Sequence, residues 1–183
     1  MTEREYLFQL AKRMQPGQRF LEIGVFGGTT LSMFAMLGPP GLEVIGMDSW
    51  ENTTANADPD TGEFVDLRTF CVRNLQKNGV ADRVTLVDGS SHAHGQLWTL
   101  PLDVLLVDGD HTYGGALQDL RDFASHVVSG GLLLIDDYWN TVAVREATER
   151  WLTEIPGGWV TEWGTMERSS HGDSKMIALR RGA

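Results

Sequence analysis

Two apolar stretches of this sequence each end abruptly on acidic residues. DVLLVDGDHTYGGA begins at residue 103, and GGLLLIDDYWN begins at residue 130. The polar side chains that follow the two apolar runs are Asp108, Asp110, His111, Asp136 and Asp137. Clustered carboxylates repel one another, so at least one pKa should rise unless a cation lies among them. Carboxylate oxygens are also the ligands that Mg²⁺ prefers, so Asp108, Asp136 and Asp137 predict a divalent-cation site. The alternative is that these acids are solvated, or that one of them caps the following helix.

A glycine-rich turn, LEIGVFGGTT at residues 21–30, is the second candidate for chemistry. Gly24, Gly27 and Gly28 allow a tight turn and the close approach of a ligand, and the helix that follows begins with free backbone amides. Phe26 stands at the second glycine of the GxGxxG dinucleotide pattern, which argues against an NAD-dependent dehydrogenase. A tight turn that binds no ligand is the alternative.

Two further segments could complete a nucleoside site. Asp48 ends the apolar stretch LEVIGMD, where a carboxylate can accept hydrogen bonds from both hydroxyls of a ribose. The segment DGSS, which starts at Asp88, follows another apolar stretch and could form a polar loop against an adenine edge. An acidic pocket of this kind suits a cofactor with a positive sulfonium better than one with a pyrophosphate.

The composition limits the classes of partner. The net charge of −10 argues against a nucleic-acid or anionic-membrane partner, because both require a cationic surface. The single cysteine, Cys71, cannot form an intramolecular disulfide, which favours a reducing compartment. No stretch resembles a signal peptide or reaches the roughly 20 apolar residues of a membrane span. We therefore expect a cytoplasmic protein that binds a small molecule.

The elements that must position these residues alternate between strands and helices. Apolar residues at helical spacing in EREYLFQLAKRM predict an N-terminal helix, and a polar loop is expected from residue 49 to a helix over about 64–77. The expected strands are RFLEIGV, LEVIGMD, RVTLVDG, DVLLVDGD and GLLLIDDY, and the expected later helices lie around 92–98 and in YGGALQDLRDFASHV and TVAVREATERWL. GWVTEWGTM and KMIALRR flank the polar turn ERSSHGDS and predict an antiparallel hairpin.

Alternation of this kind predicts an α/β fold with a doubly wound, seven-stranded and mostly parallel sheet that ends in an antiparallel hairpin. We expect one domain over residues 1–183, with an N-terminal helix at 1–17, a cofactor- and metal-binding core at 18–140, and a helix plus hairpin at 141–183. Ligands of such sheets bind outside the carboxyl ends of the strands. The acids that end four strands should therefore converge on one crevice; they are Asp48, Asp88, Asp108 and Asp136.

With these motifs in place, the sequence resembles the class I S-adenosylmethionine-dependent methyltransferases. Within that class it looks like the metal-dependent O-methyltransferases of methyltransferase family 24 type, both the catechol enzymes and those that act on macrolide and aminocoumarin sugars. In those enzymes an acid after the fourth strand and an Asp-Asp or Asp-Asn pair after the fifth bind the metal, at the 28-residue separation seen between Asp108 and Asp136. The resemblance runs from about residue 18 to the terminal hairpin.

The resemblance implies a cofactor role for residues along the whole crevice. Gly24 and Phe26 would lie against the methionyl part, Thr30 near its carboxylate, and Asp48 at the ribose. Ser90 and Ser91 would lie near the adenine. The full expected cofactor-binding set is Glu22, Gly24, Phe26, Gly28, Thr30, Asp48, Asp88, Ser90, Ser91 and Asp108.

Two residues compete to be the catalytic base. The sugar-type enzymes use the second acid of a DGD motif, which corresponds to Asp110, whereas the catechol type uses the position three residues after the metal-binding acid, which here is His111. Histidine titrates near neutrality, which favours His111 slightly. His111 could instead cap the start of the following helix.

The expected activity is Mg²⁺-assisted transfer of a methyl group to a hydroxyl of a small molecule, such as a sugar, a catechol-like ring or another natural-product intermediate. Two alternatives remain open, a relative of the cephalosporin hydroxylases and a non-catalytic cofactor-binding domain. A homodimer is plausible, because only one helix precedes the first strand, where sugar-type relatives have longer segments that cover the acceptor.

Overall fold

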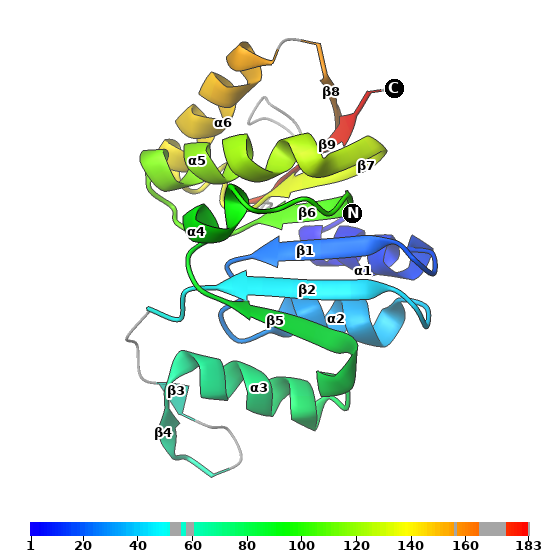
Figure 1. Ribbon diagram of the computed structural model, residues 1–183, viewed down its shortest axis with the longest axis vertical. Coiled ribbons are helices and arrows are strands. Elements are labelled where there is room, and N and C mark those ends of the chain that lie inside the picture. Colours follow the sequence, from blue (N-terminus) through cyan, green and yellow to red (C-terminus); the bar gives the residue numbers. More distant parts are fainter. Residues whose placement is uncertain (52–55, 58–60, 156, 165–174, 183) are drawn as a thin grey trace.

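A mixed sheet forms the centre of the molecule (Figure 1). The computed structural model describes residues 1–51, 56–57, 61–155, 157–164 and 175–182. The seven strands follow the order β5-β2-β1-β6-β7-β9-β8. Their bounds are β1 Arg19–Ile23, β2 Glu43–Asp48, β5 Val84–Asp88, β6 Leu102–Val107, β7 Val127–Ile135, β8 Trp159–Trp163 and β9 Ile177–Arg181. The first five along the chain are parallel, and β9 runs antiparallel to both of its neighbours. The predicted α/β sheet with a terminal antiparallel pair is confirmed.

Helices cover both faces of the sheet (Figure 1). One face packs against α1, α2 and α3, and the other against α4, α5 and α6. Their bounds are α1 Glu3–Arg13, α2 Thr29–Leu37, α3 Leu67–Lys77, α4 Ser91–Gly95, α5 Tyr113–Phe123 and α6 Val142–Glu154, with short 3₁₀ turns at Ala81–Arg83 and Ala124–His126. Because the parallel strands are buried on both sides, each contributes alternate residues to two separate apolar cores, such as Leu133 to one and Leu134 to the other.

Local chemistry explains where two of the helices begin. Thr2 caps α1 with a capping box, in which its side chain accepts from the Glu5 amide and the Glu5 side chain accepts from the Thr2 amide. Asp66 caps α3, and its Oδ1 accepts from the Thr69 amide at 2.9 Å.

The expected helix over about 64–77 was therefore placed too early. The cap at Asp66 starts the helix at Leu67, and the two residues before the cap form the short strand β4, Phe64–Val65. β4 pairs antiparallel with β3, Asn56–Ala57, within the stretch expected to be a loop from residue 49. The rest of that loop, residues 52–55 and 58–60, lies outside the described residues, as does the polar turn at 167–174.

The single cysteine lies in α3 and is fully buried. Burial raises the pKa of the Cys71 thiol to about 12, so the thiol stays protonated at neutral pH. In the part of the chain that the structure describes, no helix is both long and apolar enough to cross a membrane.

Candidate active site

A crevice of about 640 Å³ opens at the carboxyl ends of the parallel strands. It brings together residues from all five strand ends, although these residues are far apart in sequence. The predicted site residues that line the crevice are Gly24, Phe26, Asp48, Ser90, Ser91, Asp108, Asp110, His111, Asp136 and Asp137. The remaining four expected residues, Glu22, Gly28, Thr30 and Asp88, lie outside its lining.

The glycine turn packs directly against the loop that carries the acids. Gly24 has φ +87°, and a Cβ at this position would overlap the carbonyl oxygen of Asp108. Gly28 also has a positive φ, and a Cβ there would lie 2.8 Å from the Cys71 sulfur. Both positions therefore require glycine for close packing as well as for backbone conformation.

Three non-glycine residues in the described part of the chain have positive φ, and all three lie just beyond the carboxyl ends of strands. They are Phe26, Trp50 and Asp137, with φ of 49°, 59° and 51°. Such conformations are costly for residues other than glycine and persist where the surrounding structure enforces them, often at functional sites. Backbone strain is thus concentrated around this crevice.

Asp48 organises the glycine turn. Its Oδ2 accepts hydrogen bonds from the Val25 and Phe26 amides at 2.8 and 3.0 Å, and its Oδ1 accepts from the Trp50 amide at 2.8 Å. Oδ2 has thus accepted two hydrogen bonds, whereas Oδ1 keeps lone-pair capacity for one further donor. The expected ribose contact therefore stays a prediction, compatible with this geometry.

Asp88 is held at the rim of the sheet. Its Oδ1 accepts from Trp50 Nε1 and from Arg68 Nε, both at 2.8 Å. These contacts hold the pKa of the Asp88 carboxyl below its usual value, with the hydrogen bond from Arg68 as the largest cause. Asp88 fixes Trp50 and α3 at the edge of the crevice.

Glu22 lies beneath the glycine turn and is 3% exposed. Burial, followed by the nearby Asp108 carboxylate, raises the pKa of Glu22 well above its usual value, although a hydrogen bond from the Thr30 side chain acts in the opposite direction. Glu22 therefore holds its proton to a higher pH than an exposed glutamate does.

The acids of the two opening stretches come together as expected. His111 Nε2 lies 3.2 Å from Asp108 Oδ1, and His111 Nδ1 lies 3.7 Å from Asp137 Oδ2. Ligand atoms of Asp108, His111 and Asp137 all lie within 4.8 Å of one another, a spacing that can hold a metal ion. His111 therefore lies between two of the three expected metal ligands, Asp108 and Asp137, and could itself be a ligand.

Asp136, the third expected metal ligand, lies beside this group but is not one of the three residues whose ligand atoms lie within 4.8 Å of one another. Burial, then the charges of Asp108 and Glu3, raises the pKa of Asp136 to about 7. Asp136 Oδ1 and Asp137 Oδ1 are buried and receive no hydrogen bond from any described residue. Buried carboxylate oxygens without donors fit a hard divalent cation, which uses oxygen ligands of this kind.

Asp110 points away from the acid cluster toward the start of α5. Its Oδ1 accepts from the Thr112 amide at 2.9 Å, and its Oδ2 accepts from the Thr112 hydroxyl at 3.0 Å. Thr112 in turn caps the helix through the Gly115 amide. Asp110 is therefore hydrogen-bonded to the start of α5, whereas His111 lies among the acids, and the role of either as the base stays a prediction. The hydrogen bond with Asp108 is the largest cause of the raised pKa of His111.

Two residues that no sequence motif indicates, Glu3 and Lys175, also lie beside the acid cluster. Glu3, at the start of α1, accepts hydrogen bonds from the Lys175 and Met176 amides, both at 3.2 Å. Lys175 Nζ lies 3.7 Å from Asp137 Oδ1. The Glu3 contacts join segments from the two ends of the chain, and the Lys175 contact brings the C-terminal segment to the acid cluster. No local pattern signals such pairings.

Asp119 of α5 is a third residue that no sequence motif indicates, and it belongs to the lining of the crevice. It is 1% exposed and accepts a hydrogen bond from Ser91. The signal that could have found it is an acid on the helix face that also carries Ala116, Leu120 and Phe123.

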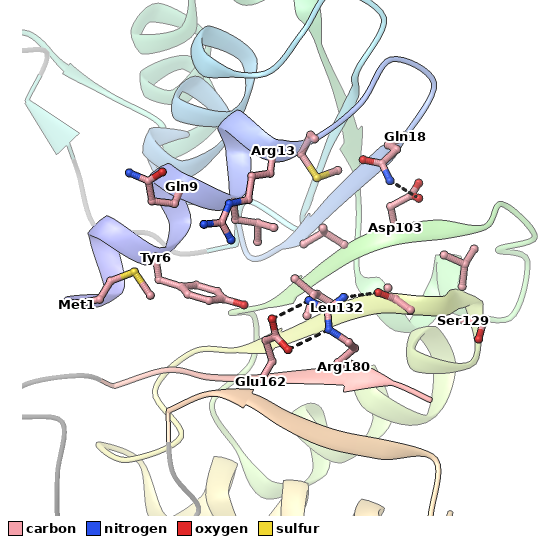
Figure 2. Close-up of a pocket in the computed structure, with 16 residues that line it drawn as sticks. Met1, Tyr6, Gln9, Arg13, Gln18, Asp103, Ser129, Leu132, Glu162 and Arg180 are labelled. Atoms are coloured by element: carbon pink, nitrogen blue, oxygen red, sulfur yellow. Dashed lines mark hydrogen bonds and ion pairs between the residues drawn. The ribbon is translucent and has the colours of Figure 1, made fainter. Parts of the chain in front are cut away.

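A second cavity, of about 330 Å³, lies between α1 and the sheet (Figure 2). Glu162 and Arg180 form a two-pronged ion pair in it, with distances of 2.7 and 2.9 Å. Asp103, also in the lining, accepts from Gln18 Nε2 and from the Arg19 amide. Its acids are thus already paired, whereas two buried carboxylate oxygens of the crevice accept no hydrogen bond from the described residues. The crevice is therefore the better candidate for catalysis.

Residues 21–138 match a family model described as a methyltransferase domain, Methyltransf_24. The chain therefore belongs to this methyltransferase domain family, and the matched segment contains the glycine turn and the acid cluster. The uncharacterized protein R132 of Acanthamoeba polyphaga mimivirus is 26% identical over 147 residues, which cover 76% of this chain and 61% of the relative. The chain thus spans less than two thirds of that relative's length.

Solved structures share the fold at low identity. The O-methyltransferase NovP superposes with a TM-score of 0.71 at 19% identity, covering 98% of this chain and 79% of NovP. TomG of Streptomyces achromogenes, an O-methyltransferase involved in tomaymycin synthesis and solved with S-adenosylmethionine, gives 0.68 at 18% identity, with 98% and 78% covered. An O-methyltransferase of Bacillus cereus in complex with S-adenosylhomocysteine gives 0.69 at 14% identity, with 99% and 82% covered.

Proposed function

We propose that this protein transfers the methyl group of S-adenosylmethionine to a hydroxyl of a small molecule, with the help of a divalent cation such as Mg²⁺. The observation that carries the proposal is a single crevice in which Gly24 packs against the backbone of Asp108. Buried oxygens of Asp136 and Asp137 in the same crevice accept no hydrogen bond from a described residue. Membership in the methyltransferase domain family supports it, as do fold neighbours solved with S-adenosylmethionine or S-adenosylhomocysteine.

The proposed site for the methyl donor and the proposed site for the cation lie at different ends of the crevice. The glycine turn and Asp48 would receive the methionyl and ribose parts of the methyl donor, and Ser90 and Ser91 the adenine. Asp108, Asp136 and Asp137 would hold the cation. When bound, S-adenosylmethionine supplies an electrophilic methyl group on a sulfonium, and the cation supplies Lewis acidity that lowers the pKa of an acceptor hydroxyl.

His111 is the proposed proton acceptor. As the acceptor oxygen forms its bond to the methyl carbon, the carbon–sulfur bond breaks and its electron pair stays on sulfur, while the hydroxyl proton passes to an imidazole nitrogen. Asp108 and Asp137, on either side of the ring, orient it and stabilise the imidazolium that results. Positioning of the acceptor supplies much of the remaining rate enhancement.

Calorimetry with S-adenosylhomocysteine, in the presence and absence of Mg²⁺, tests the cofactor. A saturable binding heat is expected, and no binding under either condition would refute the proposal. Turnover on a panel of hydroxylated acceptors, with S-adenosylhomocysteine as the measured product, then separates an enzyme from a non-catalytic binding domain. Loss of turnover in both Asp108→Ala and Asp136→Ala, with folding retained, is the expected signature of cation assistance.

A further inference from the structure

A buried acid lies behind the part of the crevice assigned to the adenine. Asp119, on α5, is 1% exposed, and its Oδ1 accepts a hydrogen bond from Ser91 Oγ at 2.5 Å. Ser91 is the first residue of α4 and lines the crevice. The other oxygen, Asp119 Oδ2, is buried and receives no hydrogen bond from any described residue.

The surroundings hold this carboxyl in place. A Cβ on Gly109 would lie 3.2 Å from Asp119 Oδ2, so the acid packs directly beneath the loop that follows β6. Burial raises the pKa of Asp119 to about 6, against the opposing effects of the Ser91 hydrogen bond and of His92 on α4. Asp110 in the loop and Asp122 on α5 are the other charged groups near it, and both act to raise the pKa.

The hydrogen bond limits what Ser91 can offer a ligand. An ionised carboxylate has no proton, so the Ser91 hydroxyl must be the donor between them. A hydroxyl has only one proton, and the Ser91 hydroxyl donates it in the hydrogen bond to Asp119. The part of Ser91 Oγ that remains free to face the crevice is therefore a lone pair, which can only accept a hydrogen bond.

We propose that Asp119 is a positioning residue that fixes the Ser91 hydroxyl as an acceptor and thereby makes the crevice select a purine with a 6-amino group. The inference rests on the proposed function, because it requires the adenine of S-adenosylmethionine to lie beside Ser91. The 6-amino group of adenine donates a hydrogen bond that matches the lone pair of Ser91. The 6-oxo group of hypoxanthine is an acceptor, and two acceptors facing each other leave both without a proton.

The test compares S-adenosylhomocysteine with S-inosylhomocysteine, which differ in the 6-position and the N1 proton of the purine. Calorimetry on the wild-type chain at about pH 8, where Asp119 is ionised, should show the adenosyl compound binding at least tenfold more tightly. Asp119→Asn should lower this ratio about tenfold or more, because its amide can donate to Ser91 and free the hydroxyl to donate in turn. Ser91→Ala should lower the ratio as well, and Asp119→Asn should have no further effect on the ratio in the Ser91→Ala background.

Asp122→Asn is the matched control, since Asp122 lies on the same helix but accepts from Gln118 and not from Ser91. It should leave the ratio at the wild-type value. Equal weakening of both ligands by Asp119→Asn would show a merely structural role and overturn the inference while the proposed function stands. A wild-type ratio in Ser91→Ala overturns it too, and does not depend on whether Asp119→Asn folds. No binding of S-adenosylhomocysteine to the wild-type chain overturns the proposed function, and this inference with it.

Discussion

Carboxylates around the crevice differ in how many of their oxygens already accept hydrogen bonds from the protein. Asp48 and Asp110 accept hydrogen bonds through both oxygens from nearby amides or a hydroxyl, and so they shape the loops that carry the site. Asp136 and Asp137 each keep one buried oxygen without a donor among the described residues. The second group is the one with capacity left for a cation or an acceptor.

The His111 and Asp110 roles can be separated by a matched pair of variants. His111→Gln should lower kcat on a hydroxylated acceptor by about 10²-fold or more, because general-base catalysis contributes on this scale. Asp110→Asn should keep kcat within about fivefold, because its carboxyl faces Thr112 and the start of α5. Steady-state kinetics at saturating methyl donor provides the measurement. The reverse order of effects would assign the proton to Asp110.

Gly24 allows a second comparison at the residue scale. Gly24→Ala should abolish the binding of S-adenosylhomocysteine and lower the free energy of unfolding by about 3 kcal/mol or more, because the added Cβ meets the Asp108 backbone. Gly17 has a similar φ of +84° but no atom within 4 Å of an added Cβ, so Gly17→Ala should cost only about 1 kcal/mol of backbone strain. Calorimetry and urea unfolding of both variants measure the difference. Equal costs would contradict the packing argument.

At the scale of elements, the ionised form of Asp119 on α5 lowers the free energy of unfolding, because the carboxylate is buried. Because burial raises the pKa of Asp119 from 3.8 to about 6, the folded state holds the proton more tightly than the unfolded state. The stabilising contribution of this group to the free energy of unfolding is therefore fully present below about pH 4, and it is lost as the pH rises through about 6. A pKa shift of about two units corresponds to roughly 3 kcal/mol.

Asp119→Asn removes this titration and keeps a side chain of nearly the same size and shape that can still hydrogen-bond to Ser91. Relative to the wild type, the variant should gain about 3 kcal/mol in free energy of unfolding at about pH 8 and almost nothing at about pH 4. Urea unfolding of both proteins at the two pH values gives the comparison. A gain of equal size at both values would mean that desolvation of the ionised carboxyl is not its cause.

The strands could be predicted from the sequence, and so could the residues at their carboxyl ends. Runs such as LLLI identify strands buried on both faces, and a parallel sheet brings their ends to one edge, so Asp108 and Asp136 had to converge. The start of α3 was misplaced, because apolar spacing continues through Phe64 while the cap at Asp66 fixes the boundary. Glu3 and Lys175 meet only through tertiary packing, which no local pattern encodes.

At the scale of the whole molecule, a cation bound in the acid cluster would add to the free energy of unfolding. A ligand that binds only the folded state stabilises it by about 2.7 kcal/mol at 100 times its Kd. For a chain of this size that corresponds to a rise in Tm of about 5–10 °C. We expect saturating Mn²⁺ or Mg²⁺ to produce such a rise in the wild type, measured by thermal unfolding.

The double variant Asp108→Asn/Asp137→Asn is the control for this effect. Its Tm should be nearly independent of the cation, because two carboxylates of the cluster are gone. Glu162→Gln changes an acid in the second cavity, whose partner is Arg180, and should leave the rise intact. A rise that survives in the double variant would place the cation elsewhere.

The contact between Gly24 and the carbonyl of Asp108 also sets a rule for protein engineering. Position 24 must remain glycine whatever methyl donor a redesigned crevice is meant to accept, because the restriction comes from the protein's own backbone on the far side of the turn. Libraries that aim to change donor preference would gain more by varying the exposed side chain of Phe26, which borders the same crevice. Gly24 is thus a position that the scaffold does not allow to change, whereas Phe26, two residues later, can be varied.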